Sequence, residues 1–125
     1  MFRGSVIAYD PAAKRDLLDV PDTVLAEHGV VSEETALAMA EGAAARLGAE
    51  VAVAVSGSAG PDPQEEPVGT MIVAVRTPQG SGARTIWMPG DRERVLTYTT
   101  TAALHLTRLA IEGGWSEEQW VPTTQ

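Results

Sequence analysis

The residue types best suited to proton transfer in this sequence are a tyrosine and a lysine near the N-terminus. Tyr9 closes a short apolar run, and Lys14 lies one helical turn into the element that follows, so their side chains can converge. A buried, desolvated amine can take the proton of a hydroxyl group and so activate the hydroxyl oxygen. Lys14 is the only lysine beside eight arginines, which makes it the only candidate for amine chemistry. A lysine on a helix surface is the alternative that the same spacing allows.

A second candidate site is a loop of small residues at 56–61, which reads Ser-Gly-Ser-Ala-Gly-Pro and follows the valine-rich run 50–55. Such a loop after a buried strand can hold a phosphate or a carbonyl oxygen with backbone N–H groups. It is not a P-loop, because no Gly-Lys-Ser or Gly-Lys-Thr follows. A tight turn without a ligand explains the composition equally well. The residues that we select for binding are Ser56, Gly57, Ala59 and Gly60.

A third candidate is a pair of arginines at the start of the last predicted helix. Arg92 and Arg94 lie where a positive charge opposes the helix dipole, at a cost of roughly a few tenths of a kcal/mol. A guanidinium in that place can bind a phosphate through its fork of N–H donors. The alternative is a solvated helix face with Arg–Glu pairs. His28 and His105 are isolated from one another, so the sequence predicts no metal site.

The composition narrows the class of protein. A chain of 125 residues has the length of one domain, and its 44% hydrophobic content can supply a core. A formal charge of −8 disfavours binding to nucleic acid and to anionic membranes. Without cysteine, the chain has no disulfide and no cysteine nucleophile. The longest apolar run, 51–55, is too short to span a bilayer and nothing resembles a signal peptide, so we expect a cytoplasmic protein.

Hydrophobic periodicity and turn residues predict an α/β domain. Asp10 and Ser32 are placed to cap helices, and Gly29 and Gly48 to end them. The expected order is a strand at 4–9, helices from 11, at 23–29 and at 32–47, strands at 50–55, 68–76 and 83–88, and a helix at 92–112. This order predicts a mixed sheet with helices packed on it in a layered α/β/α sandwich. The tail that follows carries two tryptophans, which we expect to pack on the body of the domain.

These segments, taken in order, resemble the C-terminal domain of the competence-damage-inducible CinA proteins. Residues 2–14 (FRGSVIAYDPAAK) are similar to the family's Gly-Gly-Val-Val-x-Tyr-Ser-Asn-x-x-Lys, and residues 56–61 to its Thr-Gly-x-Ala-Gly-Pro. Further similarity lies at 25–32 (LAEHGVVS), 67–70 (PVGT) and 89–92 (PGDR). Each motif alone is weak, whereas several in the right order make a specific resemblance that covers nearly the whole chain.

The resemblance implies a domain at 1–114, followed by a tail at 115–125. Its implied activity is the hydrolysis of the carboxamide of nicotinamide mononucleotide to nicotinic acid mononucleotide and ammonia, without a metal or a cofactor. In the family, a serine within an Ala-Glu-Ser-Cys-Thr-Gly-Gly segment is the expected nucleophile. Tyr9 and Lys14 occupy the positions of the tyrosine and lysine that would serve its proton transfers.

The resemblance also assigns the binding residues. Ser56 replaces the threonine of the small-residue loop and keeps its hydroxyl, and Gly57 would keep the close approach of the backbone. Arg92 is the candidate for the ligand's phosphate. An acidic stretch at 62–66 takes the place of glycines in the family's loop, and its charge would do nothing for a phosphate.

The segment with the family serine is not among these 125 residues, which begin where the family's second strand begins. We therefore expect an N-terminally shortened fold, for which three interpretations stay open. The chain is the later part of an ordinary deamidase, a shortened member that binds a nucleotide or a partner without hydrolysis, or a protein with a likeness of fold alone. A sheet without its covering helix exposes apolar surface, as does a tail with Trp115 and Trp120, so we also expect a homodimer.

Overall fold

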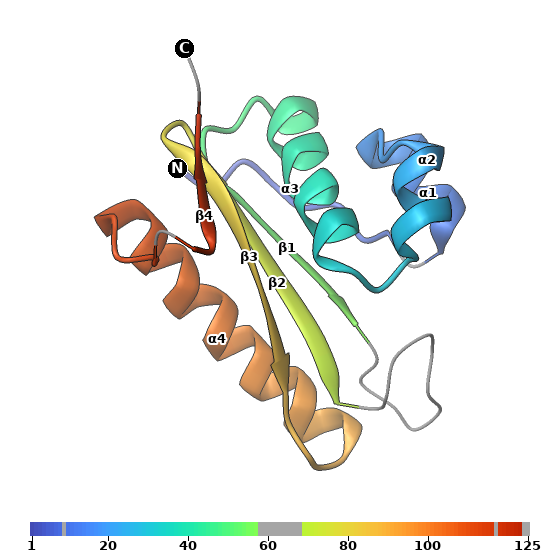
Figure 1. Cartoon of the computed structure of the whole chain (residues 1–125), viewed down its shortest axis with the longest axis vertical. Helices are drawn as coiled ribbons and strands as arrows, with labels where there is room; N and C mark the ends of the chain where they lie inside the picture. Colours follow the sequence, from blue (N-terminus) through green and yellow to red (C-terminus); the bar gives the residue numbers. More distant parts are fainter. Residues whose placement is uncertain (9, 58–68, 117, 124–125) are drawn as a thin grey trace.

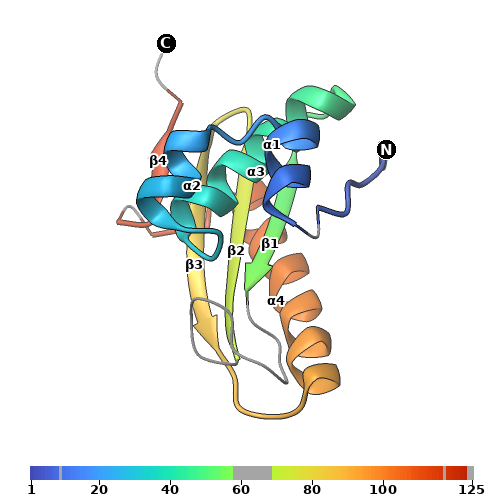
Figure 2. The same cartoon turned by 90° about the vertical axis from the view of Figure 1, so that its right-hand side faces the viewer.

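The computed structural model describes residues 1–8, 10–57, 69–116 and 118–123 of the chain. Its elements are, in chain order, α1 (Pro11–Leu18), α2 (Asp22–His28), α3 (Glu33–Leu47), β1 (Ala52–Gly57), β2 (Thr70–Thr77), β3 (Gly80–Trp87), α4 (Arg92–Glu112) and β4 (Trp120–Pro122). The strands form one sheet, with α1, α2 and α3 on one side and α4 on the other (Figures 1 and 2). This arrangement confirms the layered α/β/α class that the sequence predicts.

β2 is the central strand of the sandwich and is buried on both faces. Ile72 and Ala74 belong to the core cluster on the α3 side, whereas Val73 and Val75 belong to the cluster on the α4 side. Alternate side chains of a strand point to opposite faces, so a strand covered on both faces needs apolar residues at every position. The run Met-Ile-Val-Ala-Val meets this requirement, and all five of its residues are buried.

The neighbouring strands of the described sheet all pair antiparallel, in the order β1-β2-β3-β4. Pro78 and Gln79 form the turn between β2 and β3, which confirms the hairpin predicted from the sequence. The predicted mixed sheet is therefore corrected to an antiparallel one. A parallel pair needs a long crossover between two strands, and the strand predicted ahead of the helices is not formed.

The N-terminal segment is extended without being a strand over its described residues, 4–8. Exposure alternates along it, with Val6 and Ala8 packed against the α3-side cluster and Ile7 87% exposed. The segment is thus held by side-chain contacts with the helix layer and forms no ladder with β1. An isolated strand has little stability without such a ladder, so the prediction of a strand at 4–9 is wrong for residues 4–8, and Tyr9 lies outside the described residues.

Capping residues mark the helix boundaries, and the caps at Asp10 and Ser32 are those that the sequence indicates. Asp10, Ser32 and Asp91 each accept a hydrogen bond from the backbone N–H three residues ahead, at 2.8, 3.1 and 2.8 Å. Gly48 and Gly113 follow the last helical residues of α3 and α4 in the left-handed conformation. The caps of α1 and α4 also fix the positions of Lys14 and Arg92 on those helices.

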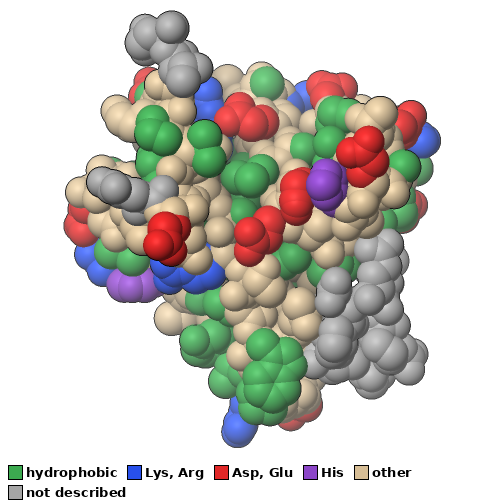
Figure 3. All heavy atoms as spheres, in the orientation of Figure 1, with side chains coloured by type: hydrophobic (Ala, Val, Ile, Leu, Met, Phe, Trp, Pro, Cys, Tyr) green, Lys and Arg blue, Asp and Glu red, His purple; other side chains and the backbone are tan. Residues whose placement is uncertain are grey.

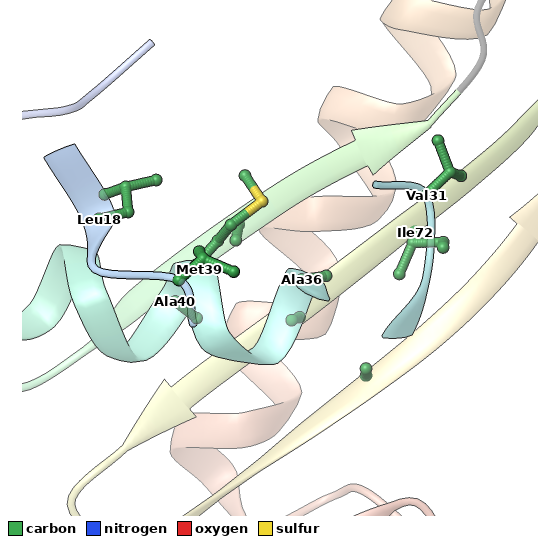
Figure 4. Packing of buried hydrophobic residues seen from close by; sticks show 10 residues of the cluster. Leu18, Val31, Ala36, Met39, Ala40 and Ile72 are labelled. Atoms are coloured by element: carbon green, nitrogen blue, oxygen red, sulfur yellow. The ribbon is translucent and has the colours of Figure 1, made fainter. Parts of the chain in front are cut away.

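A glycine joins α1 closely to α3. The core on this side contains Leu18, Met39 and Ile72, and in Figure 4 the side chain of Met39 lies between the other two. A Cβ built on Gly42 of α3 would lie 1.7 Å from the carbonyl oxygen of Leu18, so only glycine permits this approach. The end of α1 is therefore pressed onto α3, which holds the helix that carries Lys14 in place.

The C-terminal tail packs on the sandwich, as the sequence predicts. Trp115 is buried, and its indole N–H donates to the carbonyl oxygen of Leu106 at 2.9 Å. Its ring centroid lies 5.7 Å from that of Trp120 and 5.3 Å from the guanidinium of Arg84. β4 then pairs with β3. Both tryptophans are packed within the chain, so the tail gives no support to the expected homodimer.

Candidate functional site

A groove of about 1400 Å³ runs along the outer edge of β1. Residues 1–8 and β1 line it, together with Met39 and Leu47 from α3 and Arg92 and Leu96 from α4. The groove therefore lies at an edge of the sandwich, where residues of both helix layers reach it, and Figure 2 shows the N-terminal segment beyond β1 on that side. Small-molecule sites usually enclose roughly 300–1,000 Å³, so this groove has room for a nucleotide.

The groove brings together the described candidate residues from three separate segments, namely Lys14 of α1, Ser56 and Gly57 of β1, and Arg92 of α4. These residues are far apart in the sequence, and the sandwich places all of them along one groove. The other three candidates lie outside the described residues, namely Tyr9, Ala59 and Gly60.

Lys14 contributes a buried amine. The residue is 5% exposed and lies in α1 between the Asp10 cap and the buried Leu18. Its carbonyl oxygen accepts a hydrogen bond from the N–H of Val20 at 3.2 Å, where the chain turns back after the helix. An amine buried in a groove can give a proton to a bound ligand or take one from it. The predicted pairing of this amine with Tyr9 stays a prediction.

Ser56 and Gly57 end β1 beside its neighbour β2. Ser56 is buried, and its hydroxyl donates to the carbonyl oxygen of Val30 at 3.2 Å, while its oxygen can still accept a hydrogen bond. A Cβ on Gly57 would lie 2.4 Å from the carbonyl oxygen of Thr70. The backbone of β2 therefore requires glycine at this position, which gives the residue a structural role beside the binding role that the sequence suggests.

The two arginines at the start of α4 lie in different surroundings. Arg92 is exposed and lines the groove, whereas Arg94 lines a separate hollow of about 590 Å³ together with Met88 and Tyr98. Residues two apart on a helix do not share a face. Of this pair, Arg92 is therefore the one that a ligand in the groove can contact.

The described lining of the groove is slightly basic, although the whole protein is acidic. Among its described lining residues, Arg3, Lys14 and Arg92 are basic, and Asp10 and Glu50 are acidic. The whole chain has a formal charge of −8, and acidic side chains gather over the α2 and α3 side in Figure 3. A phosphate is therefore attracted to the groove more strongly than to the surface as a whole.

Other kinds of site find less support in the described part of the chain. His28 lies 3.5 Å from Glu34 and 3.8 Å from Glu27, and His105 lies 3.1 Å from Arg108. No group of three or more His, Asp or Glu side chains in the described ranges is arranged to hold a metal ion. Nor does any helix in these ranges combine the length and the apolar character needed to cross a membrane.

Sequence reasoning missed the apolar side of the groove. Val51, Val53 and Val55 are 37%, 42% and 40% exposed, although the run 50–55 is predicted to be buried. Val53 pairs with Val75, so these valines lie on the α4 face of an edge strand that α4 covers only in part. The alternation of valine with alanine was the available signal, because it indicates two different faces.

The family model of the CinA C-terminal domain matches residues 1–111, which include every candidate site residue. The chain belongs to this family. A CinA-like protein of Mycobacterium sp. (strain JLS) is 48% identical over 114 residues, and one of Frankia casuarinae is 43% identical over 113 residues. The alignments cover 89% and 90% of this CinA-family chain but 27% and 26% of those proteins. The chain thus spans about a quarter of the length of these relatives.

Solved structures of CinA-family proteins share the fold. The competence damage-inducible protein A of Klebsiella pneumoniae is 33% identical, with a TM-score of 0.79 over 87% of this chain and 68% of that one. The competence/damage inducible protein CihA of Agrobacterium tumefaciens is 36% identical, with a TM-score of 0.73 over 78% of this chain and 62% of that one. The α/β sandwich described above is therefore the fold of its family.

Proposed function

We propose that this CinA-family chain binds nicotinamide mononucleotide in the groove along β1 and acts in the hydrolysis of its carboxamide to nicotinic acid mononucleotide and ammonia. The observation that carries the proposal is the convergence of Lys14, Ser56 and Arg92 on one groove. The three residues offer an amine, a hydroxyl oxygen and a guanidinium. These groups suit a ligand with a carboxamide and a phosphate.

The binding half of the proposal rests on charge and hydrogen-bond complementarity. Arg92 can bind two phosphate oxygens through its fork of N–H donors. The Ser56 oxygen can accept a hydrogen bond from the amide nitrogen, because its own proton is donated to Val30. The basic balance of the described lining residues favours an anion.

The chemical half of the proposal rests on Lys14. Hydrolysis adds the elements of one water molecule, forms a new carbon–oxygen bond and breaks the bond between the carbonyl carbon and the amide nitrogen. The nitrogen must take up a proton before it leaves as ammonia, and a buried amine in the groove is suited to that transfer. The nucleophile implied by the family resemblance belongs to a serine segment that these 125 residues do not contain.

A second candidate function is a nucleotide-binding protein without hydrolysis. Ser56 is poorly placed to replace the family serine, since its hydroxyl proton is engaged with the Val30 carbonyl oxygen. The binding groups of the groove do not depend on a nucleophile. The two candidate functions therefore differ in ammonia release and agree in nucleotide binding.

Calorimetric titration of the purified chain with nicotinamide mononucleotide tests the binding half. Arg92→Ala is expected to raise the Kd roughly 10- to 150-fold, because a hydrogen bond to a charged group contributes about 1.5–3 kcal/mol. Arg94→Ala is the matched control, since it removes the same charge from the same helix outside the groove. An equal loss of affinity in both variants would show that only the net charge matters and would contradict the role of Arg92.

Ammonia release from the same nucleotide tests the chemical half. We expect the unaltered chain to release ammonia, Lys14→Ala to lower the rate about 100-fold or more, and Arg94→Ala to leave it unchanged. Nucleotide binding without release would overturn hydrolysis and support the second candidate function. If the chain did not bind the nucleotide and released no ammonia, both candidate functions would be overturned.

A further inference from the structure

The side chain of Ser56 lies on the face of the sheet that α3 covers. Ser56 pairs with Ile72 of β2, and paired residues of antiparallel strands point to the same face. Ile72 belongs to the core cluster on the α3 side, so Ser56 lies on that face as well. The residue is 8% exposed and lines the groove. Its hydroxyl is therefore a buried polar group in the wall of the groove.

The partner of the Ser56 hydroxyl determines where its proton points. The hydroxyl oxygen lies 3.2 Å from the carbonyl oxygen of Val30, and a carbonyl oxygen can only accept a hydrogen bond. Serine has one hydroxyl proton, so the bond to Val30 uses it. Turning this proton toward a ligand would break a part-buried hydrogen bond and leave the carbonyl oxygen without it, which costs free energy. Toward the groove, Ser56 is thus held as an acceptor.

The carbonyl oxygen of Val30 is held in place by the residues on either side of it. The carbonyl oxygen of Gly29 accepts a hydrogen bond from the hydroxyl of Thr35 at 2.6 Å and another from the hydroxyl of Ser32 at 3.1 Å. Thr35 is buried at the start of α3. On the other side, Val31 is buried in the α3-side cluster. The Val30 oxygen therefore cannot readily follow a hydroxyl that turns away from it.

A fixed acceptor distinguishes a carboxamide from a carboxylate. The nitrogen of a carboxamide carries two N–H donors, and one of them can bond to an oxygen that only accepts. An ionised carboxylate has no donor, so two acceptors would face each other in its place. A site built to bond a substrate N–H rejects the analogue that lacks it, because the polar group of the site is left unpaired. The Ser56 oxygen therefore favours the amide form of a ligand that reaches it.

We propose that Ser56, oriented by the carbonyl oxygen of Val30, makes the groove prefer a carboxamide to the carboxylate that hydrolysis would leave. This inference rests on the proposed function and names a specificity-determining residue of the same site. It also gives the groove a way to release its product, because the hydrogen bond to Ser56 is lost once the nitrogen has left. Under the second candidate function, the same preference would let the chain distinguish the two nucleotides without hydrolysis.

The ratio of two dissociation constants tests the inference. Calorimetric titration gives, for each variant, the Kd of nicotinic acid mononucleotide divided by the Kd of nicotinamide mononucleotide. We expect this ratio to fall about 10-fold in Ser56→Ala, because a hydrogen bond to the amide and an unfavourable contact with the carboxylate are both removed. Attraction of the carboxylate to basic residues is the same in both proteins and cancels in the comparison. Ser81→Ala is the matched control, since it removes a hydroxyl from β3, outside the groove, and should leave the ratio unchanged.

A second variant separates the hydroxyl from the packing of this buried position. Ser56→Thr keeps the hydroxyl and should keep a ratio close to that of the unaltered chain. A fall as large as in Ser56→Ala would assign the effect to packing and overturn the inference.

The same titrations distinguish failure of the inference from failure of the proposed function. An unchanged ratio in Ser56→Ala, with both nucleotides bound, would overturn the inference and leave the proposed function in place. If neither nucleotide bound to the unaltered chain, the proposed function would be overturned and the inference with it.

Discussion

At Gly42, the lack of a side chain decides how closely α1 approaches α3. The carbonyl oxygen of Leu18 occupies the space that a Cβ would fill. Because Leu18 ends α1, the helix that Asp10 caps, this contact also fixes the position of Lys14 in the groove. Gly42, which has no reactive side chain, thereby helps to position the amine of Lys14.

Replacing Gly42 with alanine should destabilise the protein, although a glycine-to-alanine change in a helix usually stabilises. In the interior of an exposed helix, glycine to alanine stabilises by about 1 kcal/mol. Here we expect a loss of about 2 kcal/mol or more in the free energy of unfolding, because α1 must move away to admit the methyl group. The midpoint of urea unfolding measures the change.

Gly113→Ala is the control for this prediction. A Cβ at that position meets nothing within 4 Å, so only the left-handed backbone costs free energy, about 1–2 kcal/mol. A Gly42→Ala midpoint equal to that of the unaltered chain would show that α1 moves away without cost. It would also remove the argument that this contact holds Lys14.

For Ser56, the sequence predicts the place at the end of a strand but not the hydrogen-bond partner. Its place after a valine-rich run predicts a residue at the end of a strand, and β1 does end beside it at Gly57. Its hydrogen bond to Val30 joins residues 26 positions apart. No local pattern contains that partner, since it depends on how the segment before α3 lies against the sheet.

Among the elements, the tail is the clearest case of a segment whose role comes from packing. Trp115 buries its ring against the α4-side cluster and donates its indole N–H to the carbonyl oxygen of Leu106. Two tryptophans in a short tail predict packing on the body of the domain. They do not predict β4, because three residues carry too little pattern to identify a strand.

Removing the indole N–H of Trp115 should weaken this element. We expect Trp115→Phe to lower the free energy of unfolding by about 1–3 kcal/mol, since it removes the buried hydrogen bond to the carbonyl oxygen of Leu106 and part of a buried ring. Trp87→Phe is the matched control, because Trp87 is 63% exposed and should change stability by less than about 0.5 kcal/mol. Equal effects of the two substitutions in urea unfolding would contradict the role of the hydrogen bond.

β1 was predicted two residues too early, at 50–55, and in the wrong environment, and its last residues, Ser56 and Gly57, were predicted to lie in the loop. Its length and valine content indicate a strand, and a strand forms at Ala52–Gly57. Burial requires a neighbour on every side, and β1 is the edge strand of the described sheet. Position along a chain does not reveal whether a strand lies at the edge or in the centre.

For the whole molecule, the shared strand β2 should make unfolding a single event. The α3-side and α4-side clusters both contain residues of β2, so neither helix layer can separate from the sheet without disturbing the other. We expect unfolding followed by far-ultraviolet circular dichroism and by tryptophan fluorescence to have the same midpoint. A fluorescence change that precedes the loss of helix would show that the α4 layer unfolds independently.

Charge is also a property of the whole molecule. The formal charge of −8 comes directly from the sequence, as does the argument against nucleic acid that follows from it. The slight local excess of basic residues along the groove cannot be derived from the sequence. It consists of Arg3, Lys14 and Arg92 against Asp10 and Glu50. It arises because the fold gathers residues of the N-terminal segment, α1 and α4 at one edge of the sheet.

The sequence by itself determined the helices, their caps, the β2–β3 hairpin and the resemblance to the CinA C-terminal domain. These features depend on interactions between residues that are close along the chain, or on ordered motifs. Only the tertiary structure decided that the sheet is antiparallel, that residues 4–8 form no strand and that Arg92 and Arg94 diverge. It also decided that β1 lies at the edge of the described sheet with its valines partly exposed, because edges, grooves and long-range hydrogen bonds exist only when distant segments meet.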